Sequence, residues 1–182
     1  RVAVVGKPNV GKSSFVNRLF GEERSVVSPI PGTTRDPIDS TMKFNGMDLI
    51  FIDTAGLRRQ SRVKDSLEYY STLRTARVLI EADVCVVLVD ATEEVSHQDL
   101  RIIEQAWEAS CSVILVANKW DLVEKDHMTS AKYEREIRAR APFLKWVPFV
   151  FTSALSGQRV RKCLDQILEV QEVRHQRIST PE

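Results

Sequence analysis

Residues with the types and spacing needed to hold a phosphate group follow the first apolar run of the chain. The segment GKPNVGKS, residues 6–13, fits the pattern G-x-x-x-x-G-K-[ST] directly after VAVV. Gly6 and Gly11 let the backbone wrap tightly so that its N–H groups converge on phosphate oxygens, and the start of the following helix adds its positive dipole end. Lys12 would then reach the outer phosphates, and the Ser13 hydroxyl would ligate Mg²⁺. A glycine-rich turn that only connects a strand to a helix would not need this Lys-Ser pair.

A second set of candidate residues lies in the segment DTAG. Asp53 ends the apolar run LIFID, where a carboxylate would be out of water unless it faced a cation. We therefore expect Asp53 on the metal side of the site, acting through a water molecule, with a helix cap as the alternative. Gly56 would let the backbone approach the terminal phosphate. Asp90 also ends an apolar run, but no motif accompanies it, and a structural role is expected there.

The segment NKWD, residues 118–121, brings a carboxylate, an amide and a lysine stem into one loop. The edge of guanine offers two adjacent N–H donors, which one carboxylate accepts as a bidentate pair, whereas adenine has a ring acceptor there. Asp121 is therefore expected to select guanine. The segment TSALSG, residues 152–157, could offer backbone N–H groups to the base oxygen, although Ser153 could equally be an ordinary turn residue.

The apolar runs of the chain predict a scaffold that brings these motifs together. Each run is too uniformly apolar for a sheet with one wet face, which is typical of strands buried on both sides. Helical patterns separate the runs, so we expect an α/β fold with a mostly parallel sheet and helices on both faces. Ligands bind at the carboxyl ends of the strands in such sheets, where the motifs fall. The predicted strands are VAVV (2–5), LIFID (49–53), VCVVLVD (84–90), SVILVA (112–117) and VPFVFTS (147–153).

A sixth strand is predicted at the edge of this sheet. Asn45-Gly46 is a two-residue hairpin signal, which would pair a strand near Thr41–Phe44 antiparallel to residues 49–53. The sheet should therefore have six strands, with one antiparallel edge strand.

Helices are predicted from apolar spacings of three or four residues and from one capping signal. Ser96 with Asp99 is a capping-box variant that starts a helix, and His97 in its first turn is expected to be solvated rather than catalytic. The apolar positions of the two clearest helices are Val63, Leu67, Tyr70, Leu73, Ala76 and Ile80, then Val160, Leu164, Ile167 and Leu168.

The composition is that of one globular domain. The chain has 182 residues, 43% of them hydrophobic, and a formal charge of +1, so charge alone gives no support for a nucleic-acid or membrane surface. Three widely spaced cysteines are too few for a CxxC metal site and are expected to be reduced and mostly buried. No apolar run approaches the ~20 residues needed to span a bilayer, so no membrane partner is expected.

Taken together, the motifs resemble the Ras-like GTPase superfamily over essentially the whole chain. The segments GKPNVGKSSFVNRL, PGTTRD, DTAGLRR, NKWDLVEKD, PFLKWVPFVFTSALSGQRV and RIST look like the second G domain of the ribosome-assembly GTPase family Der, also called EngA. The resemblance implies a three-layer P-loop GTPase domain. That family joins two G domains in tandem to a C-terminal KH-like domain and associates with the large ribosomal subunit. We expect residues 1–182 to be a single G domain excised from such a protein.

The resemblance also assigns residues to the metal sites. Thr34 in PGTTRD matches the switch I residue that ligates Mg²⁺ and senses the γ-phosphate. Relatives with an asparagine in the P-loop, as at Asn9, include members that place K⁺ beside the β- and γ-phosphates, with switch I carbonyls at the positions of Ser28 and Ile30. A turn residue that tolerates unusual backbone angles is an equally open interpretation of Asn9. Pro31 stands where alanine is more often expected, which leaves the geometry of this loop open.

Leu57 occupies the position where Ras-type GTPases carry the glutamine that orients the attacking water. It resembles the hydrophobic-substituted GTPases, which turn this residue away and position water by other means. A K⁺ ion between the phosphates would stabilise developing charge as an arginine finger does, an effect of ~10³–10⁵ in rate. We expect slow, K⁺-stimulated turnover, below the enzyme median of ~10 s⁻¹.

The sequence therefore predicts a domain that binds and hydrolyses GTP with Mg²⁺, and with K⁺ as a further cofactor. The predicted catalytic residues are Lys12, Thr34, Gly56 and Asn9. The predicted nucleotide contacts are Asn9, Val10, Gly11, Lys12, Ser13, Ser14, Thr34, Asp53, Gly56, Asn118, Lys119, Asp121, Ser153, Ala154 and Leu155. The predicted metal ligands are Ser13, Thr34 and Asp53 for Mg²⁺, and Asn9, Ser28 and Ile30 for K⁺.

Two other functions stay open at this point. A P-loop ATPase or kinase would share the phosphate loop, but Asn118 and Asp121 argue against it. A scaffold that binds GDP or GTP with negligible hydrolysis is favoured by Leu57. The resemblance implies the ribosome or its RNA as partner of the full-length protein, together with the neighbouring G and KH-like domains. It also implies the bacterial cytoplasm, or an organelle of bacterial ancestry, as the location.

Overall fold

The computed structural model describes residues 1–22, 39–55, 57 and 68–175. Strands and helices alternate along them, as the apolar runs predict. The strands are β1 (Val2–Val5), β2 (Ser40–Phe44), β3 (Met47–Phe51), β4 (Val84–Asp90), β5 (Ser112–Asn118) and β6 (Phe149–Phe151). The helices are α1 (Lys12–Glu22), α3 (Glu68–Glu81), α4 (His97–Glu108), α5 (Thr129–Arg140) and α6 (Val160–His175), with 3₁₀ turns η1 (Trp120–Leu122) and η2 (Pro142–Trp146).

The six strands form one sheet in the order β2-β3-β1-β4-β5-β6. All neighbours pair in parallel except β2 and β3, which form the antiparallel edge. Asn45 and Gly46 connect these two strands with φ angles of 48° and 82°, the left-handed backbone that a tight hairpin turn requires. The predicted mostly parallel sheet with one antiparallel edge is confirmed.

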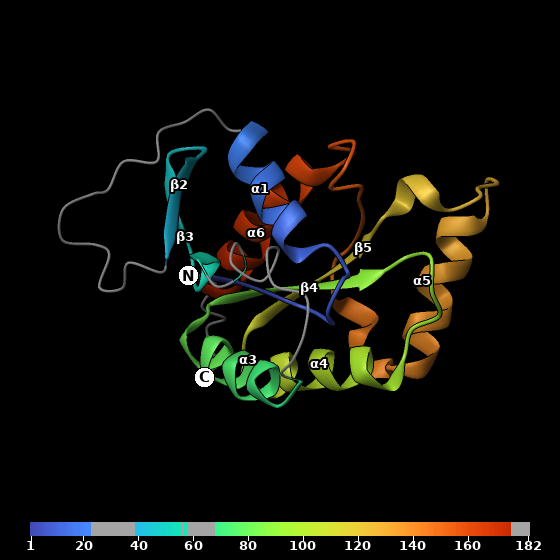
Figure 1. Cartoon of the computed structure of the whole chain (residues 1–182), viewed down its shortest axis with the longest axis horizontal. Coiled ribbons are helices and arrows are strands. Elements are labelled where there is room, and N and C mark those ends of the chain that lie inside the picture. Colours follow the sequence, from blue (N-terminus) through green and yellow to red (C-terminus); the bar gives the residue numbers. More distant parts are fainter. Residues whose placement is uncertain (23–38, 56, 58–67, 176–182) are drawn as a thin grey trace, which may run out of the picture.

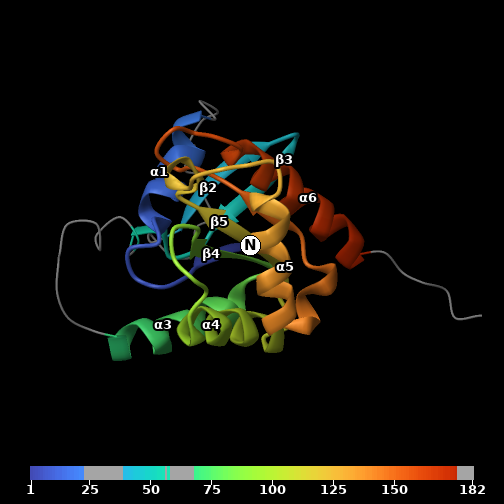
Figure 2. The same ribbon diagram turned by 90° about the vertical axis from the view of Figure 1, so that its right-hand side faces the viewer.

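Helices cover both faces of the sheet, which gives three layers. Figure 1 shows α1 and α6 on one side and α3 and α4 on the other, and in Figure 2 α5 lies on the same side as α4. Strand β4 shows why both faces are apolar: Val84, Val86 and Leu88 belong to the core under α1 and α6, and the alternate residues belong to the core under the other helices. Because side chains alternate across a strand, a strand covered on both sides must be apolar throughout.

Several predicted boundaries differ from the structure. β3 ends at Phe51, two residues before Asp53, and β6 is limited to Phe149–Phe151. In α3, the buried residue of the last turn is Leu79, at 1% exposure, whereas Ile80 is 80% exposed. The prediction that Ile80 lies on the apolar face is therefore wrong, because a turn of 3.6 residues brings its neighbour to the core instead.

The helix after β4 begins as predicted. Ser96 is the N-cap of α4, and its hydroxyl accepts a hydrogen bond from the Asp99 backbone while the Asp99 carboxylate accepts one from the Ser96 backbone. His97 is exposed in the first turn, in agreement with the prediction. None of the helices within the described ranges is long and apolar enough to cross a bilayer.

The three cysteines, Cys85, Cys111 and Cys163, are free thiols in the core, as the composition predicts. Burial raises the pKa of Cys163 to about 12. Burial, with the nearby Cys111, also raises the pKa of Cys85 well above its ordinary value. These thiols fill the core and stay protonated.

Candidate nucleotide-binding site

The polar motifs meet at one edge of the sheet, where the parallel strands end. β1 leads into the phosphate loop, β4 ends at Asp90, β5 ends at Asn118, and β6 is followed by Thr152. The parallel register of β4 and β5 brings two of these ends side by side, because Asp90 on β4 lies opposite Asn118 on β5. This is the edge at which open α/β sheets bind ligands.

Close backbone contacts explain the glycines of the phosphate loop. A Cβ added to Gly6 would lie 2.4 Å from the carbonyl oxygen of Leu88, and one added to Gly11 would lie 2.4 Å from the amide nitrogen of Asn118. Both glycines also have positive φ angles, 149° and 96°. Asn9 has a φ of 65°, which asparagine tolerates better than most residues. The loop is therefore wound tightly against β4 and β5.

Lys12 begins α1, and its ammonium group turns back over the phosphate loop. It donates hydrogen bonds to the carbonyl oxygens of Gly6, at 2.8 Å, and Lys7, at 2.6 Å. Burial lowers the pKa of Lys12 to about 8, because only neutral carbonyls compensate for the lost water. An ammonium group has three donors, so one remains for an anion placed in the loop.

Ser13 contacts the segment that follows DTAG through one hydrogen bond. The Ser13 hydroxyl donates to the carbonyl oxygen of Leu57. Asp53 lies in a turn with a φ of 57°, and its backbone N–H donates to the Asp39 carboxylate at 3.0 Å. The Leu57 side chain packs against the core under α1 and α6. The expectation that Asp53 ends its strand is wrong, because the strand pairing stops at Phe51.

Asn118 joins the loops of the site. Its side chain, 2% exposed, donates from Nδ2 to the carbonyl oxygen of Val10 at 2.9 Å. Its Oδ1 accepts from the backbone N–H of Ala154 at 3.0 Å and from the Thr152 hydroxyl at 3.3 Å. Asn118, predicted from the sequence as a nucleotide contact, therefore links the phosphate loop to the loop after β6.

Lys119 and Asp90 form an ion pair beside this amide. Their charged atoms lie 2.5 Å apart, and Lys119 takes a left-handed conformation with φ 63°. Burial would raise the pKa of Asp90, but hydrogen bonds from Lys119 and Thr92 outweigh it and lower the pKa. The structural role predicted for Asp90 therefore includes fixing the lysine stem of the NKWD motif.

Asp121 is exposed in η1, and within the described parts of the chain its carboxylate has no hydrogen-bond partner. This leaves the carboxylate open toward a base. In the loop after β6, the Ser153 N–H donates to Gln158 and the Ala154 N–H donates to Asn118. The N–H of Leu155, which is 76% exposed, has no acceptor among the described residues.

Arg18 is a contact that sequence reasoning missed. From α1 it donates through Nε to the carbonyl oxygen of Ala154, at 3.0 Å, and through its terminal nitrogen to the carbonyl oxygen of Leu155. It therefore fixes the loop after β6 to the helix that carries Lys12 and Ser13. The residues lie far apart in the sequence, and no motif connects them.

Four predicted residues lie outside the part of the chain that the structure describes. They are Thr34 and Gly56, predicted at the terminal phosphate, and Ser28 and Ile30, predicted at K⁺. Within the described residues, no three His, Cys, Asp or Glu side chains form a group that could hold a metal ion. Ser14, predicted at the phosphates, is exposed on the first turn of α1.

The strand order, the phosphate loop after β1 and the NKWD loop after β5 define a Ras-like P-loop GTPase fold. A sequence model described as 50S ribosome-binding GTPase matches residues 1–119, and the chain belongs to that family. It is 58% identical to GTPase Der of Gemmatimonas aurantiaca and 51% identical to GTPase Der of Caldicellulosiruptor saccharolyticus, over 100% and 99% of its length. It spans only 42% and 41% of those proteins.

Solved structures agree with this assignment. Era in complex with MgGDPNP and nucleotides 1506–1542 of 16S ribosomal RNA has a TM-score of 0.69 and 29% identity, over all of this chain and 58% of that one. Era of Aquifex aeolicus bound to GDP·AlF₄⁻ has a TM-score of 0.65 and 28% identity, over all of this chain and 57% of that one. The elongation factor SelB of Methanococcus maripaludis, at 15% identity, shares the fold alone.

Proposed function

We propose that this chain is a G domain that binds GTP, hydrolyses it to GDP and phosphate, and changes its switch segments as it does so. The observation that carries the proposal is the buried amide of Asn118, which bonds the phosphate loop at Val10 and the base loop at Ala154. Beside it, Asp121 leaves its carboxylate exposed. A ligand with phosphates at one end and a guanine edge at the other fits both features.

The phosphate loop supports binding of an anion in two ways. The backbone around Gly6 and Gly11 is wound so that a helix N-terminus faces the loop, and Lys12 keeps one donor free. Burial removes the water that stabilises the charged form of Lys12. A bound phosphate would place negative charge beside the ammonium group, so binding should raise the lowered pKa of this lysine. Lys12 is thus expected to stabilise the charge that grows on the β-phosphate oxygens when water attacks the γ-phosphorus.

The residues present fit Mg²⁺ by their chemistry. Mg²⁺ prefers oxygen ligands, keeps several waters and is held with substrate phosphates, which suits a Ser13 hydroxyl and an Asp53 carboxylate acting through water. Bound at the phosphates, Mg²⁺ would neutralise developing negative charge. The Ser13 hydroxyl now donates to Leu57, so Ser13 has to exchange that bond to ligate the metal. We propose Thr34 as a further ligand.

K⁺ is proposed as the charge that replaces a missing catalytic group. The Leu57 side chain has no polar atom with which to orient water, and it packs against the core under α1 and α6. The left-handed Asn9 has its amide on the exposed side of the phosphate loop, where it could serve a cation together with carbonyls at Ser28 and Ile30. We expect the resulting turnover to be slow.

The experiment that tests this proposal compares GTP hydrolysis with Mg²⁺ in KCl and in NaCl at equal ionic strength. Faster hydrolysis in KCl supports the cation as the catalytic charge. Equal rates well above background support GTPase activity without K⁺, and rates at background in both salts refute hydrolysis by this domain. Competition of ATP against labelled GDP completes the test, because displacement by ATP as efficient as by GTP would refute guanine selection.

Asn9→Ala tests the K⁺ site directly. The substitution should reduce K⁺-stimulated hydrolysis while GDP affinity changes less than about threefold, because the side chain is exposed and the loop backbone carries the phosphate contacts. Hydrolysis rates in KCl and NaCl are measured for both proteins. Full stimulation in the variant would remove Asn9 from the ion site.

A ribosomal role is proposed for the longer protein to which this chain corresponds. The family is described as 50S ribosome-binding GTPase, and GTPase Der is more than twice the length of the matched segment. We propose that the chain is the second of two G domains, followed by a KH-like domain, in a protein that assists assembly of the large ribosomal subunit in the cytoplasm. Sedimentation of the full-length protein with ribosomal subunits in GTP and in GDP tests this.

A nucleotide-dependent scaffold with negligible hydrolysis is the second candidate function. Leu57 favours it, because the residue in this position supplies no hydrogen bond to water. Single-turnover hydrolysis by the domain separates the two functions, since a scaffold would release its GTP intact.

A further inference from the structure

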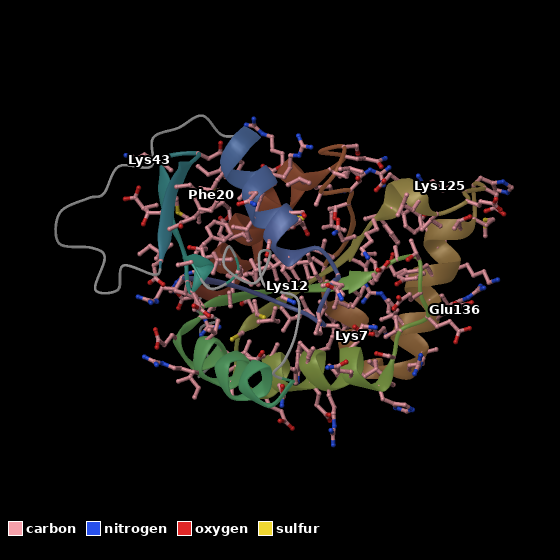
Figure 3. All side chains as sticks on the ribbon, viewed as in Figure 1. Lys7, Lys12, Phe20, Lys43, Lys125 and Glu136 are labelled. Atoms are coloured by element: carbon pink, nitrogen blue, oxygen red, sulfur yellow. The ribbon has the colours of Figure 1, made fainter. Side chains whose placement is uncertain are left out.

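The Lys7 side chain connects the phosphate loop to the start of α4. Its ammonium group lies 3.0 Å from the carboxylate of Asp99 and 3.4 Å from that of Glu93. Figure 3 labels Lys7 on the α4 side of the loop, near Lys12, and labels Lys43 on β2, far from both. Asp99 is 2% exposed, whereas the Glu93 side chain is 63% exposed. The pair with Asp99 is therefore the one that is shielded from water.

The helix cap alone does not account for this ion pair. Oδ2 of Asp99 already accepts hydrogen bonds from the Ser96 backbone, at 2.8 Å, and from the Ser96 hydroxyl, at 2.6 Å. The N-terminus of α4 is thus capped without Lys7. Lys7 adds a third donor to the same oxygen, and Oδ1 of Asp99 is buried without a partner among the described residues. A buried carboxylate in this position holds the lysine strongly, because losing the counter-charge is costly.

The backbone of Lys7 also contacts a group that belongs to the site. The carbonyl oxygen of Lys7 accepts the shorter of the two hydrogen bonds from the Lys12 ammonium, 2.6 Å against 2.8 Å for Gly6. A side chain anchored to α4 restricts the backbone that carries this carbonyl. Burial would lower the pKa of Lys7, but Asp99 and Glu93 raise it, so the anchor stays charged at neutral pH.

We propose that Lys7, held by Asp99, is a positioning residue for Lys12. The chain of contacts runs from the buried carboxylate of α4 through the Lys7 side chain to its carbonyl oxygen, and from there to the ammonium group that receives the phosphates. The start of α4 thereby sets the position of the phosphate-binding lysine. This inference rests on the proposed function, in which Lys12 contacts the β- and γ-phosphates.

The position of Lys12 matters only for nucleotides that reach it. GDP and GTP carry a β-phosphate, whereas GMP carries only the α-phosphate. Loss of the Lys7 anchor should therefore weaken GDP and GTP binding and leave GMP binding nearly unchanged. A general loss of folding would weaken all three nucleotides, so the comparison separates positioning from stability.

The test measures the affinities of GDP, GTP and GMP for the wild type, Lys7→Gln, Lys7→Arg and Lys43→Gln. GMP affinity is obtained by displacement of a fluorescent GDP analogue. Lys7→Gln should weaken GDP and GTP by roughly tenfold, the size of coupling common within one ion-pair network, and GMP by less than about twofold. Lys7→Arg should recover most of the loss, because it can still reach the carboxylate. Lys43→Gln removes an equal charge from an exposed position of β2 and should bind like the wild type.

Asp99→Asn, together with the variant that combines it with Lys7→Gln, gives a double-mutant cycle for the ion pair. If the two residues act through one contact, the double variant should bind GDP no more weakly than the weaker single variant. The double variant also guards against misfolding, because its two amides leave no unpaired buried charge. Thermal unfolding of every variant confirms that it is folded under the assay conditions.

Equal loss of GMP and GDP affinity in Lys7→Gln would overturn the proposal. It would also be overturned if the loss of GDP affinity in the double variant equalled the product of the losses in the two single variants. These outcomes are separate from a failure of GTP hydrolysis. If the wild type hydrolyses no GTP but the variants show the predicted losses of GDP and GTP affinity, the GTPase proposal is refuted and the positioning role is supported. A wild-type protein that binds none of the three nucleotides would refute both.

Discussion

The base side and the metal side of the site are held in different ways. On the base side, Asn118 is buried, and its amide bonds the Val10 carbonyl and the Ala154 N–H. On the metal side, the Ser13 hydroxyl donates to the Leu57 carbonyl, a bond that must be exchanged before Ser13 can ligate Mg²⁺. The loops proposed to hold the base are therefore linked within the fold, whereas Mg²⁺ binding at Ser13 would require a change of hydrogen bond.

This difference suits a molecular switch. A site that binds GTP and GDP alike gains affinity from a rigid structure, because binding then does not lose entropy by ordering side chains and loops. A group that must sense the terminal phosphate needs two arrangements of similar free energy. The predictions below test whether the two sides differ in this way.

The largest effect is expected on the base side, from Asp121→Asn. The amide can no longer accept two N–H donors, so affinity for GTP and GDP should fall by roughly 10³-fold, less than the ~10⁴–10⁵ of fully buried hydrogen-bond sites. Because Asp121 is exposed, the melting temperature of the nucleotide-free protein should stay unchanged. Equilibrium binding measures the affinity, and thermal unfolding measures the melting temperature. Unchanged affinity would refute the base-recognition argument.

Asn118→Ala should damage both stability and binding. It leaves the Val10 carbonyl and the Ala154 N–H without their partner, and buried groups left unpaired cost about 1–3 kcal/mol each, so the free energy of unfolding should fall by about 3 kcal/mol. Urea denaturation of the nucleotide-free protein measures this. A loss below about 1 kcal/mol would mean that the amide is not the link between the loops.

The pH dependence of binding tests the phosphate side. Burial lowers the pKa of Lys12 to about 8, and a bound phosphate should raise it. Above pH 8 the protein should therefore take up a proton when GDP binds. Affinity should therefore fall above pH 8 by up to about tenfold per pH unit. The nucleotide-free protein should behave in the opposite way, because the ordinary pKa is 10.5 and the unfolded chain binds more protons between pH 8 and 10.5. Its free energy of unfolding should therefore rise between pH 8 and 10.5, and calorimetry or urea denaturation measures this change.

The smallest effect is expected from Arg18→Ala. The arginine holds the carbonyl oxygens of Ala154 and Leu155, and its loss should free the base loop without removing a contact to the nucleotide. GDP dissociation should become about three- to tenfold faster, since one or two hydrogen bonds from a charged group are lost. Stopped-flow release of a fluorescent GDP analogue measures the rate. Arg77→Ala, an exposed residue of α3, is the matched control and should leave the rate unchanged.

Sequence alone predicts the parts of this molecule that depend on local chemistry. The tight loop before Lys12, the hairpin at Asn45-Gly46 and the cap at Ser96 all follow from neighbouring residue types, and the structure has each of them. The sheet follows because strands covered on both faces must be uniformly apolar.

Features that depend on three-dimensional neighbours were not predictable in the same way. Whether Asp53 continues β3 depends on pairing with β1 and β2, and that pairing stops at Phe51. The contact between Arg18 and Ala154 joins segments that only the finished fold brings together. The contact of Lys7 with Asp99 has no signal in the sequence, because the phosphate motif specifies only the residues that the phosphates require.

The buried thiols have a practical consequence for the study of the switch. Thiol reagents attack the thiolate, and burial raises the pKa of all three cysteines while it hides them from solvent. The native protein should therefore stay unlabelled by maleimide dyes at neutral pH. A single cysteine introduced at exposed Lys43, on the edge strand that follows switch I, would carry the only dye without removal of Cys85, Cys111 or Cys163. Fluorescence from that position could then report whether the β2–β3 hairpin moves during the proposed hydrolysis of GTP.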